Sequence, residues 1–229
     1  MLIDQLILSD RKSITLTIER DGRLVVRAPK RLPQSEIQRF VDEHTDWVRE
    51  KRLYLEAHPQ PVKHHFKSGE HFQFLGQPVR LEVVSRSTSR QPLRYLPASD
   101  GSEAVFEVLK TTQTHTRELL VSWYRKQALQ VCSERAAALA KQHGLRYTRL
   151  RITSARARWG SCSSKGTISF TYRLVTLPPE IIDYVVIHEL AHTVEHNHSK
   201  QFWSRLEAIL PDYKRRRLWL KKNGNSFSF

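Results

Sequence analysis

Two histidines four residues apart, with a glutamate directly after the first, form a stretch that could bind a metal ion. It reads His188-Glu189-Leu190-Ala191-His192 and has the H-E-x-x-H pattern. On a helix, positions i and i+4 lie on one face, so His188 and His192 could bind one ion together. Zinc suits such a site, because it takes neutral imidazole nitrogens and keeps one coordination position for water when it is catalytic. Glu189 would then act as general base toward that water.

A catalytic zinc site of this kind needs a third protein ligand. His198 stands just beyond the expected end of the helix, where the chain turns back, and is the preferred candidate. His196 continues the four-residue series, but at ~1.5 Å per residue it lies ~12 Å along the axis from His188. Glu207 is the alternative, because some zinc hydrolases use an acid as third ligand. We expect Cys162 to pack around the site, with thiolate ligation of the ion as the alternative.

The residues around the motif predict a buried helix. Pro178-Pro179-Glu180 suits a first helical turn, where proline and acidic residues are favoured. We expect the helix to end at Asn197, which tolerates the left-handed conformation, and Ser199 to cap a second helix. Apolar residues recur at helical spacing on most sides of the segment, at Ile181, Ile182, Val185, Val186, Leu190 and Val194.

The N-terminal half of the chain reads as β-rich with one long helix. Residues 1–28 predict strands, with a hairpin turn at Asp21-Gly22. One helix is expected from Ser35 to about Glu56, because an apolar stripe runs through it. Residues 71–84 predict a hairpin that turns at Gly76-Gln77.

The change from strands to helix near residue 112 predicts a boundary between two domains. A second long helix is expected to begin at Thr114 or Thr116 and to end at Gly144. Strands at 145–153 and 167–172 then lead to the metal helix. The predicted fold class is α+β, with a β-rich region over residues 1–112 and a metal-binding catalytic domain over residues 113–229.

Composition indicates a globular protein with anionic partners. The 229 residues include 38 Lys and Arg against 23 Asp and Glu, which gives a net charge of +15 and a pI near 10.2. Such an excess favours nucleic acids, nucleotides or acidic surfaces, although a basic surface without a specific partner is the alternative. The runs Lys214-Arg215-Arg216-Arg217 and Lys221-Lys222 predict non-specific contact with a nucleic acid backbone.

The cysteine count and the hydropathy pattern indicate the cellular compartment in which the protein is expected. Cys132 and Cys162 are the only cysteines and suggest no disulfide framework, so we expect a reducing, cytoplasmic location. The N-terminus has no basic lead before its short apolar run and predicts no secretory signal. No apolar run approaches ~18 residues, so we expect no membrane partner.

Several motifs together resemble the YgjP-like metallohydrolase family, which is related to SprT-like and other minimal zincin proteases. The resemblance covers about residues 150–205 and implies a zincin-like minimal metalloprotease fold in the C-terminal half. It also implies one zinc ion per chain, held by His188, His192 and His198, with Glu189 as general base. At Thr171 the chain departs from the family, which often carries asparagine there. The matching residues are Arg158-Trp159-Gly160-Ser161-Cys162-Ser163, the segment 184–192, Asn197-His198-Ser199 and Phe202-Trp203.

The preferred substrate prediction is a peptide. A metal would polarise the peptide carbonyl, Glu189 would activate water, and the strand at 167–171 would pair with the extended substrate. A nucleic-acid-associated metalloprotease or binding module is a further alternative, because a basic surface and a metal site can coexist.

The main alternative is a nucleotide pyrophosphatase that hydrolyses a nucleoside triphosphate such as UTP, an activity that the resemblance also implies. Arg156, Arg158, Lys165 and Arg173 would bind the phosphates, because arginine forks match phosphate oxygens. If the substrate is a nucleotide, magnesium is a further candidate cofactor. Structural pairing of these cations is the opposing interpretation.

Overall fold

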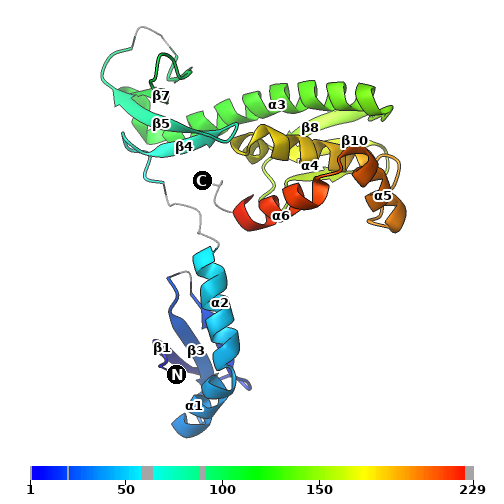
Figure 1. Ribbon diagram of the computed structural model, residues 1–229. Coiled ribbons are helices and arrows are strands. Elements are labelled where there is room, and N and C mark those ends of the chain that lie inside the picture. The colour runs from blue at the N-terminus through cyan, green and yellow to red at the C-terminus, as the bar shows by residue number, and fades with distance from the viewer. Residues whose placement is uncertain (1, 20, 58–63, 88–90, 225–229) are drawn as a thin grey trace. The chain divides into compact units, whose positions relative to one another are not determined.

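The chain folds into two compact units, residues 1–61 and residues 62–229, in a computed structural model (Figure 1). We call them the N-terminal unit and the C-terminal unit. The described residues form six α-helices and three small sheets, which confirms the predicted α+β class. The structure describes residues 2–19, 21–57, 64–87 and 91–224.

The N-terminal unit is a three-stranded sheet with two helices. Its strand order is β1-β3-β2, where β3 pairs parallel with β1 and antiparallel with β2. Leu24, Val26 and Ala28 of β3 form a core with Ile37 and Val41 of the first helix. The elements are β1 (Gln5–Ser9), β2 (Thr15–Ile18), β3 (Leu24–Pro29), α1 (Gln34–Glu43) and α2 (Thr45–Ala57).

The single long helix predicted from Ser35 to Glu56 is wrong, because the chain leaves helical geometry at His44. His44 has φ −106° and ψ 19°, and its Nδ1 lies 2.8 Å from the carbonyl oxygen of Phe40. The Thr45 hydroxyl donates to the carbonyl of Asp42 at 2.8 Å. These local hydrogen bonds offer the backbone an alternative to a continuous helix.

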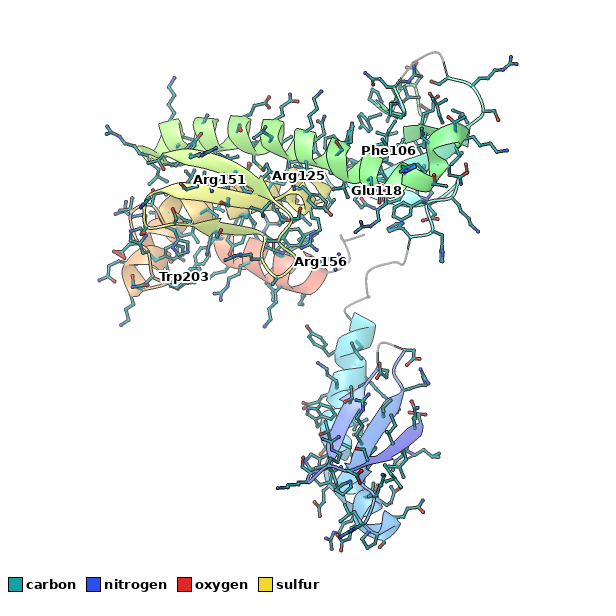
Figure 2. The ribbon with its side chains drawn as sticks, turned by 180° about the vertical axis from the view of Figure 1, so that it is seen from behind. Phe106, Glu118, Arg125, Arg151, Arg156 and Trp203 are labelled. Atoms are coloured by element: carbon teal, nitrogen blue, oxygen red, sulfur yellow. The ribbon has the colours of Figure 1, made fainter. Side chains whose placement is uncertain are left out.

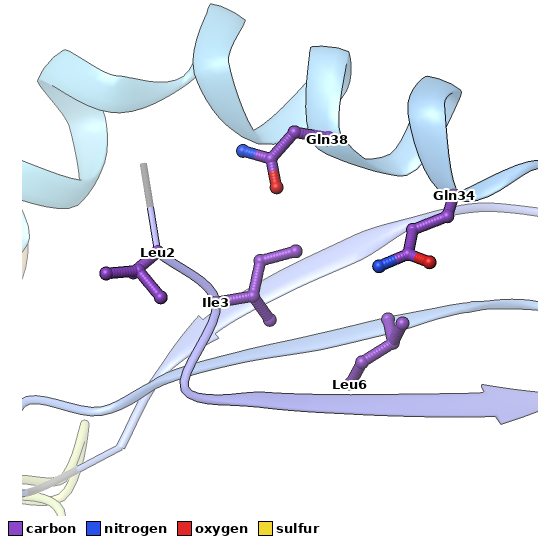
Figure 3. A pocket seen from close by; sticks show the side chains of 5 residues that line it. All are labelled: Leu2, Ile3, Leu6, Gln34 and Gln38. Atoms are coloured by element: carbon purple, nitrogen blue, oxygen red, sulfur yellow. The ribbon is translucent and has the colours of Figure 1, made fainter.

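A pocket lies on the N-terminal unit between β1 and α1 (Figure 3). Three apolar and two amide side chains line it. None of them is a candidate catalytic, metal-binding or phosphate-binding residue. Its lining residues are Leu2, Ile3, Leu6, Gln34 and Gln38.

The C-terminal unit begins with a four-stranded sheet of order β4-β5-β7-β6. Phe106 from this sheet is fully buried against Trp123 and Tyr124 of the long helix α3 (Thr116–His143), with ring centroids 4.7 and 5.8 Å away. The boundary predicted near residue 112 therefore falls inside this unit, since sheet and helix share one core. The strands are β4 (His71–Phe74), β5 (Gln77–Val84), β6 (Leu93–Leu96) and β7 (Ala104–Leu109).

Helix α3 runs along the C-terminal unit and ends at Gly144, which has φ +63° (Figure 1). Of the two predicted starts, Thr114 and Thr116, the helix begins at Thr116, and the predicted stop at Gly144 is confirmed. Glycine suits this stop because it adopts a left-handed conformation readily. Beside α3 lies a second sheet of order β8-β10-β9. Its strands are β8 (Arg149–Thr153), β9 (Gly160–Cys162) and β10 (Thr167–Thr171). Within the described ranges no helix is long and apolar enough to span a bilayer.

Three further helices complete the unit, and the first is the metal helix. Helix α4 packs against α3, α5 and α6 as well as against β9 and β10. Its residues Ile182, Val186 and Leu190 are almost fully buried, so the predicted burial on most sides is confirmed for the helix itself. Val194, predicted in the same apolar row, lies beyond the helix and is exposed. The helices are α4 (Pro179–Ala191), α5 (Lys200–Ile209) and α6 (Tyr213–Asn223).

The turn between β4 and β5 fixes the start of the metal helix. The backbone N–H groups of Leu75 and Gly76 donate to the carbonyls of Val175 and Thr176 at 2.8 and 3.2 Å. Gly76 has φ +75°, and a Cβ at this position would lie 2.9 Å from the Cα of Pro178, just before α4. Two independent reasons therefore favour glycine at position 76: the left-handed backbone conformation and the lack of space for a Cβ.

Substitution of Gly76 by alanine tests this contact against a matched control. Gly101 also has a left-handed φ, +81°, but a Cβ there would meet nothing within 4 Å. We expect Gly101→Ala to lower the free energy of unfolding by about 1 kcal/mol through backbone strain, and Gly76→Ala by about 3 kcal/mol or more. Urea denaturation measures both. Equal losses would contradict a steric role for Gly76.

Candidate metal centre

Helix α4 ends at Ala191, earlier than the predicted end at Asn197. His192 follows directly and keeps nearly helical dihedral angles, φ −66° and ψ −14°, with its N–H donating to the His188 carbonyl at 3.3 Å. The four-residue spacing of the two histidines therefore still places them on one face. The Thr193 hydroxyl donates back to the carbonyl of Leu190 at 2.7 Å, and tight turns replace further helix. The early end lets the chain turn back to bring His198 to the other two histidines.

The three imidazoles converge on one point. The Nε2 atom of His198 lies 3.0 Å from Nε2 of His188 and 3.2 Å from Nε2 of His192. Among the described residues these three form the group of possible ligands, with one donor atom each and all within 4.8 Å of one another. Nitrogens on a tetrahedral zinc ion with bonds of ~2.1 Å would lie about 3.4 Å apart. The three side chains therefore fit a zinc ion closely.

Hydrogen bonding and burial keep these rings suited to a cation. Nδ1 of His192 lies 2.9 Å from the Glu195 carbonyl, so it donates its proton there and leaves Nε2 as the free lone pair. Burial lowers the pKa of His188 to about 3, with further lowering from His192, His198 and Arg217. The buried Nδ1 of His188 has no partner among the described residues. The lowered pKa keeps His188 neutral, which is the form that binds metal.

Aromatic side chains from the start of α5 hold two of the rings. Ser199 caps this helix, as predicted, and its hydroxyl accepts the Phe202 N–H at 3.2 Å. Phe202 is fully buried and stacks on His192 with ring centroids 4.4 Å apart. Trp203 stacks on His198 at 5.4 Å. The cap therefore fixes two flat surfaces that orient the histidines.

Glu189 lies against β9, and its position depends on Gly160. A Cβ on Gly160 would lie 2.6 Å from both Cγ and Oε1 of Glu189, so no other residue fits this place on the strand without movement. Burial raises the pKa of Glu189 to about 8, opposed by the nearby cation of Arg158. A divalent ion beside the carboxyl would favour its charged form. The glycine of the Trp159-Gly160-Ser161 stretch therefore makes room for the acid.

Among the described residues, the four basic residues predicted to bind phosphate form no hydrogen bond with the three histidines. Arg173 is half-buried, donates to the Ala155 carbonyl at 2.8 Å and lies 5.6 Å over the ring of Trp159. Lys165 is exposed at the turn between β9 and β10. Within the described part of the chain, no interaction joins Arg156 or Lys165 to the histidines. Of these four residues, Arg158 acts on the site through its charge, which lowers the pKa of Glu189 against the effect of burial.

The other candidate ligands lie outside the histidine group. Glu207 accepts a hydrogen bond from Lys214 at 3.0 Å on the exposed side of α5. His196 is exposed in the turn after α4. Cys162 packs near the site, and burial together with Glu189 raises the pKa of its thiol. A raised pKa disfavours the thiolate that a zinc ligand requires. Thr171, at the position where the family often has asparagine, is buried, and its hydroxyl has no partner among the described residues.

Two residues near the site had no role at the metal centre assigned to them in the sequence analysis. Tyr184 lies one turn before His188, with ring centroids 5.9 Å apart, and its i−4 spacing could have revealed it. Arg217 lies 4.7 Å over the ring of Trp203 and helps to lower the pKa values of His188 and His198. In the sequence, Arg217 is only one member of a basic run. The packing of α6 against α4 brings it to the site.

Replacing each of two nearby histidines tests the ligand set. We expect His198→Ala to lose most of its bound zinc and His196→Ala to retain it, because only His198 points its Nε2 at the other two rings. Metal analysis after gel filtration in zinc-buffered solution measures both. If the two variants retain zinc equally, His198 is not the third ligand.

A double-mutant cycle tests the contact between Gly160 and Glu189. Alone, Gly160→Ala should lower the free energy of unfolding by about 1–3 kcal/mol, because the added methyl overpacks the carboxylate. In a Glu189→Ala background the same change should be neutral or stabilising, since alanine suits a strand better than glycine. Denaturant unfolding of the four proteins gives the coupling. Additive effects would show that the two residues do not compete for space.

Comparison with known proteins gives the family. Residues 12–223 match the YgjP-like, metallopeptidase domain family, which is nearly the whole chain. Among solved structures, the crystal structure of the metallopeptidase zymogen of Pyrococcus abyssi abylysin is 24% identical, covering 42% of this chain and 99% of that chain. Its TM-score of 0.37 is a weak match of fold. A search of curated proteins finds no significant match.

The family match confirms the resemblance seen in the motifs and extends it beyond residues 150–205. Metallopeptidases depend on a divalent metal, and the group formed by His188, His192 and His198 could hold one. The chain belongs to the YgjP-like family of metallopeptidase domains, which supports a metal-dependent hydrolase.

Proposed function

We propose that this protein is a zinc-dependent metallopeptidase. The observation that carries the proposal is the meeting of three imidazole nitrogens within 4.8 Å, beside a buried glutamate on the same helix. Three neutral nitrogen ligands suit zinc and leave a position for water, whereas magnesium prefers oxygen ligands. The family match to metallopeptidase domains supports the peptide as substrate class.

Three of the side chains would hold the ion, and Glu189 would transfer a proton. His188, His192 and His198 would hold the ion, with His192 oriented by the Glu195 carbonyl. The metal, when bound, supplies Lewis acidity that acidifies water and polarises a carbonyl. Glu189 takes the proton of the attacking water at its carboxylate and later delivers it to the leaving amine nitrogen. Its burial excludes other water from that transfer.

The substrate strand must differ from the one predicted. β10 is the middle strand of its sheet, paired parallel with β8 and antiparallel with β9, so residues 167–171 have no free edge for a peptide. That prediction is wrong. β9 is an edge strand, contacts α4 and carries Gly160 directly over Glu189. We therefore assign the outer edge of β9 as the place where an extended peptide adds a strand.

The nucleotide pyrophosphatase alternative has no comparable support. Its four predicted phosphate ligands do not gather around the histidines, and Arg173 is committed to the Ala155 carbonyl and the Trp159 ring. The peptidase proposal accounts for both the metal ligands and the placement of the glutamate.

An assay of zinc-loaded protein against casein and a mixed peptide library tests the proposal. We expect peptide cleavage that Glu189→Gln lowers by about 100-fold or more, because the amide cannot accept the proton. Glu207→Gln is the matched control, since Glu207 is an exposed acid paired with Lys214. Zinc content should stay the same in both variants. Full activity in Glu189→Gln, or cleavage of nucleoside triphosphates without cleavage of any peptide, would overturn the proposal.

A further inference from the structure

A long segment of the C-terminal unit carries positive charge without any negative charge. Residues 135–179 contain nine lysines and arginines and no aspartate or glutamate. The segment covers the end of α3 and all of the β8-β10-β9 sheet. The segment therefore has a net charge of +9, against +15 for the whole chain.

Strand register places two of these arginines on one face of the sheet. Arg149 and Arg151 of β8 lie beside Thr167 and Ser169 of β10, and Ser169 lies beside Ser161 of β9. Paired residues share a face, so we define these five as the open face. The alternate residues on the other face, such as Ile168 and Phe170, are fully buried against the helices.

The arginines of the open face are exposed and free of acids. Arg149 and Arg151 are both exposed, and no described carboxylate forms an ion pair with either. Arg125 of α3 extends the charge past the end of β8, where it donates to the Ser154 hydroxyl at 2.8 Å and the Ile152 carbonyl at 3.3 Å. Figure 2 shows Arg151, Arg125 and, in the loop beyond the strand, Arg156.

The basic run of α6, which the sequence favoured for nucleic acid, is engaged within the protein. Lys214 pairs with Glu207, and Arg215 and Arg216 both pair with Asp212. Arg216 also donates to the Glu180 carbonyl at 2.7 Å, and Arg217 lies over Trp203. Two acids thus pair with three of the six cations of α6. The open face keeps its charge unneutralised.

We propose that the open face of the β8-β10-β9 sheet binds the sugar-phosphate backbone of nucleic acid. Arg149 and Arg151 lie ~6.7 Å apart along the strand, which presents repeated cations to a linear polyanion. The hydroxyls of Thr167, Ser169 and Ser161 add hydrogen-bond donors for phosphate oxygens beside them.

The chemistry of the face determines the kind of partner. None of its five residues is aromatic or large and apolar, so it offers no surface for stacking bases and none for insertion into lipid. Backbone contact without sequence readout is what arginines and hydroxyls alone provide. Glu189 lies under Gly160 on the opposite face of the sheet, so bound nucleic acid leaves the metal centre open. The proposal is independent of the peptidase activity.

Fluorescence anisotropy with a labelled mixed-sequence DNA duplex and its single strand tests the open face. Wild-type protein should bind at about 50 mM salt and weaken steeply as salt rises. Arg149→Glu together with Arg151→Glu should weaken binding by about tenfold or more and lower the log-log salt slope by about 2. Arg149→Gln with Arg151→Gln should show a smaller loss in the same direction.

The matched control carries the same change of net charge on α6, through Lys221→Glu and Lys222→Glu. This control should retain most of the affinity, because both lysines lie outside the open face. Thermal unfolding and zinc content show that each variant is folded. Equal losses in the two charge-reversed variants, no DNA binding by the wild type, or tighter binding to phosphatidylserine vesicles than to DNA would each overturn the proposal.

Discussion

Three imidazole nitrogens that lie within 4.8 Å of one another, with His198 at 3.0 and 3.2 Å from the other two, set the central constraint on the C-terminal unit. A cation between the rings stabilises this arrangement by accepting one lone pair from each nitrogen, whereas a proton can join only two of them at a time. The surrounding structure holds the rings in place. The Glu195 carbonyl fixes one tautomer, and Phe202 and Trp203 cover two ring faces. The early end of α4 and the cap of α5 follow from the need to return His198 to the helix.

The same packing that shapes the metal centre also places the glutamate. Glu189 is almost fully buried because β9 crosses it at a glycine. A side chain at Gly160 would displace the carboxylate, so the strand and the helix must be considered together. The four-stranded sheet contributes at a distance, because the Leu75-Gly76 turn is bonded to the residues just before α4. Both sheets of the unit thus position a single helix.

The distribution of charge separates two surfaces that composition alone cannot distinguish. The net charge of +15 applies to the whole chain, but acids near α6 pair with its basic residues. The sheet behind the metal centre has no acids within its own segment. Ion pairs on an exposed surface contribute little to stability, yet they decide where a positive potential remains.

Patterns in the sequence predicted the metal motif, the long helix that ends at Gly144, the cap at Ser199 and the α+β class. These features depend on local spacing and on residues with strong conformational preferences. The break at His44 and the end of α4 at Ala191 were missed, because short-range hydrogen bonds from His44, Thr45 and Thr193 compete with helix at single positions.

The surroundings of the histidines follow from tertiary packing and could not be predicted from local sequence. Strand order made β9 an edge and β10 a middle strand, which no alternation pattern reveals. Helix packing brought Arg217 to the site and committed Arg173 elsewhere. Such contacts join residues far apart in the chain, and their energies depend on the packing of whole elements. Local sequence patterns carry that information weakly, since side-chain type and spacing do not specify a partner.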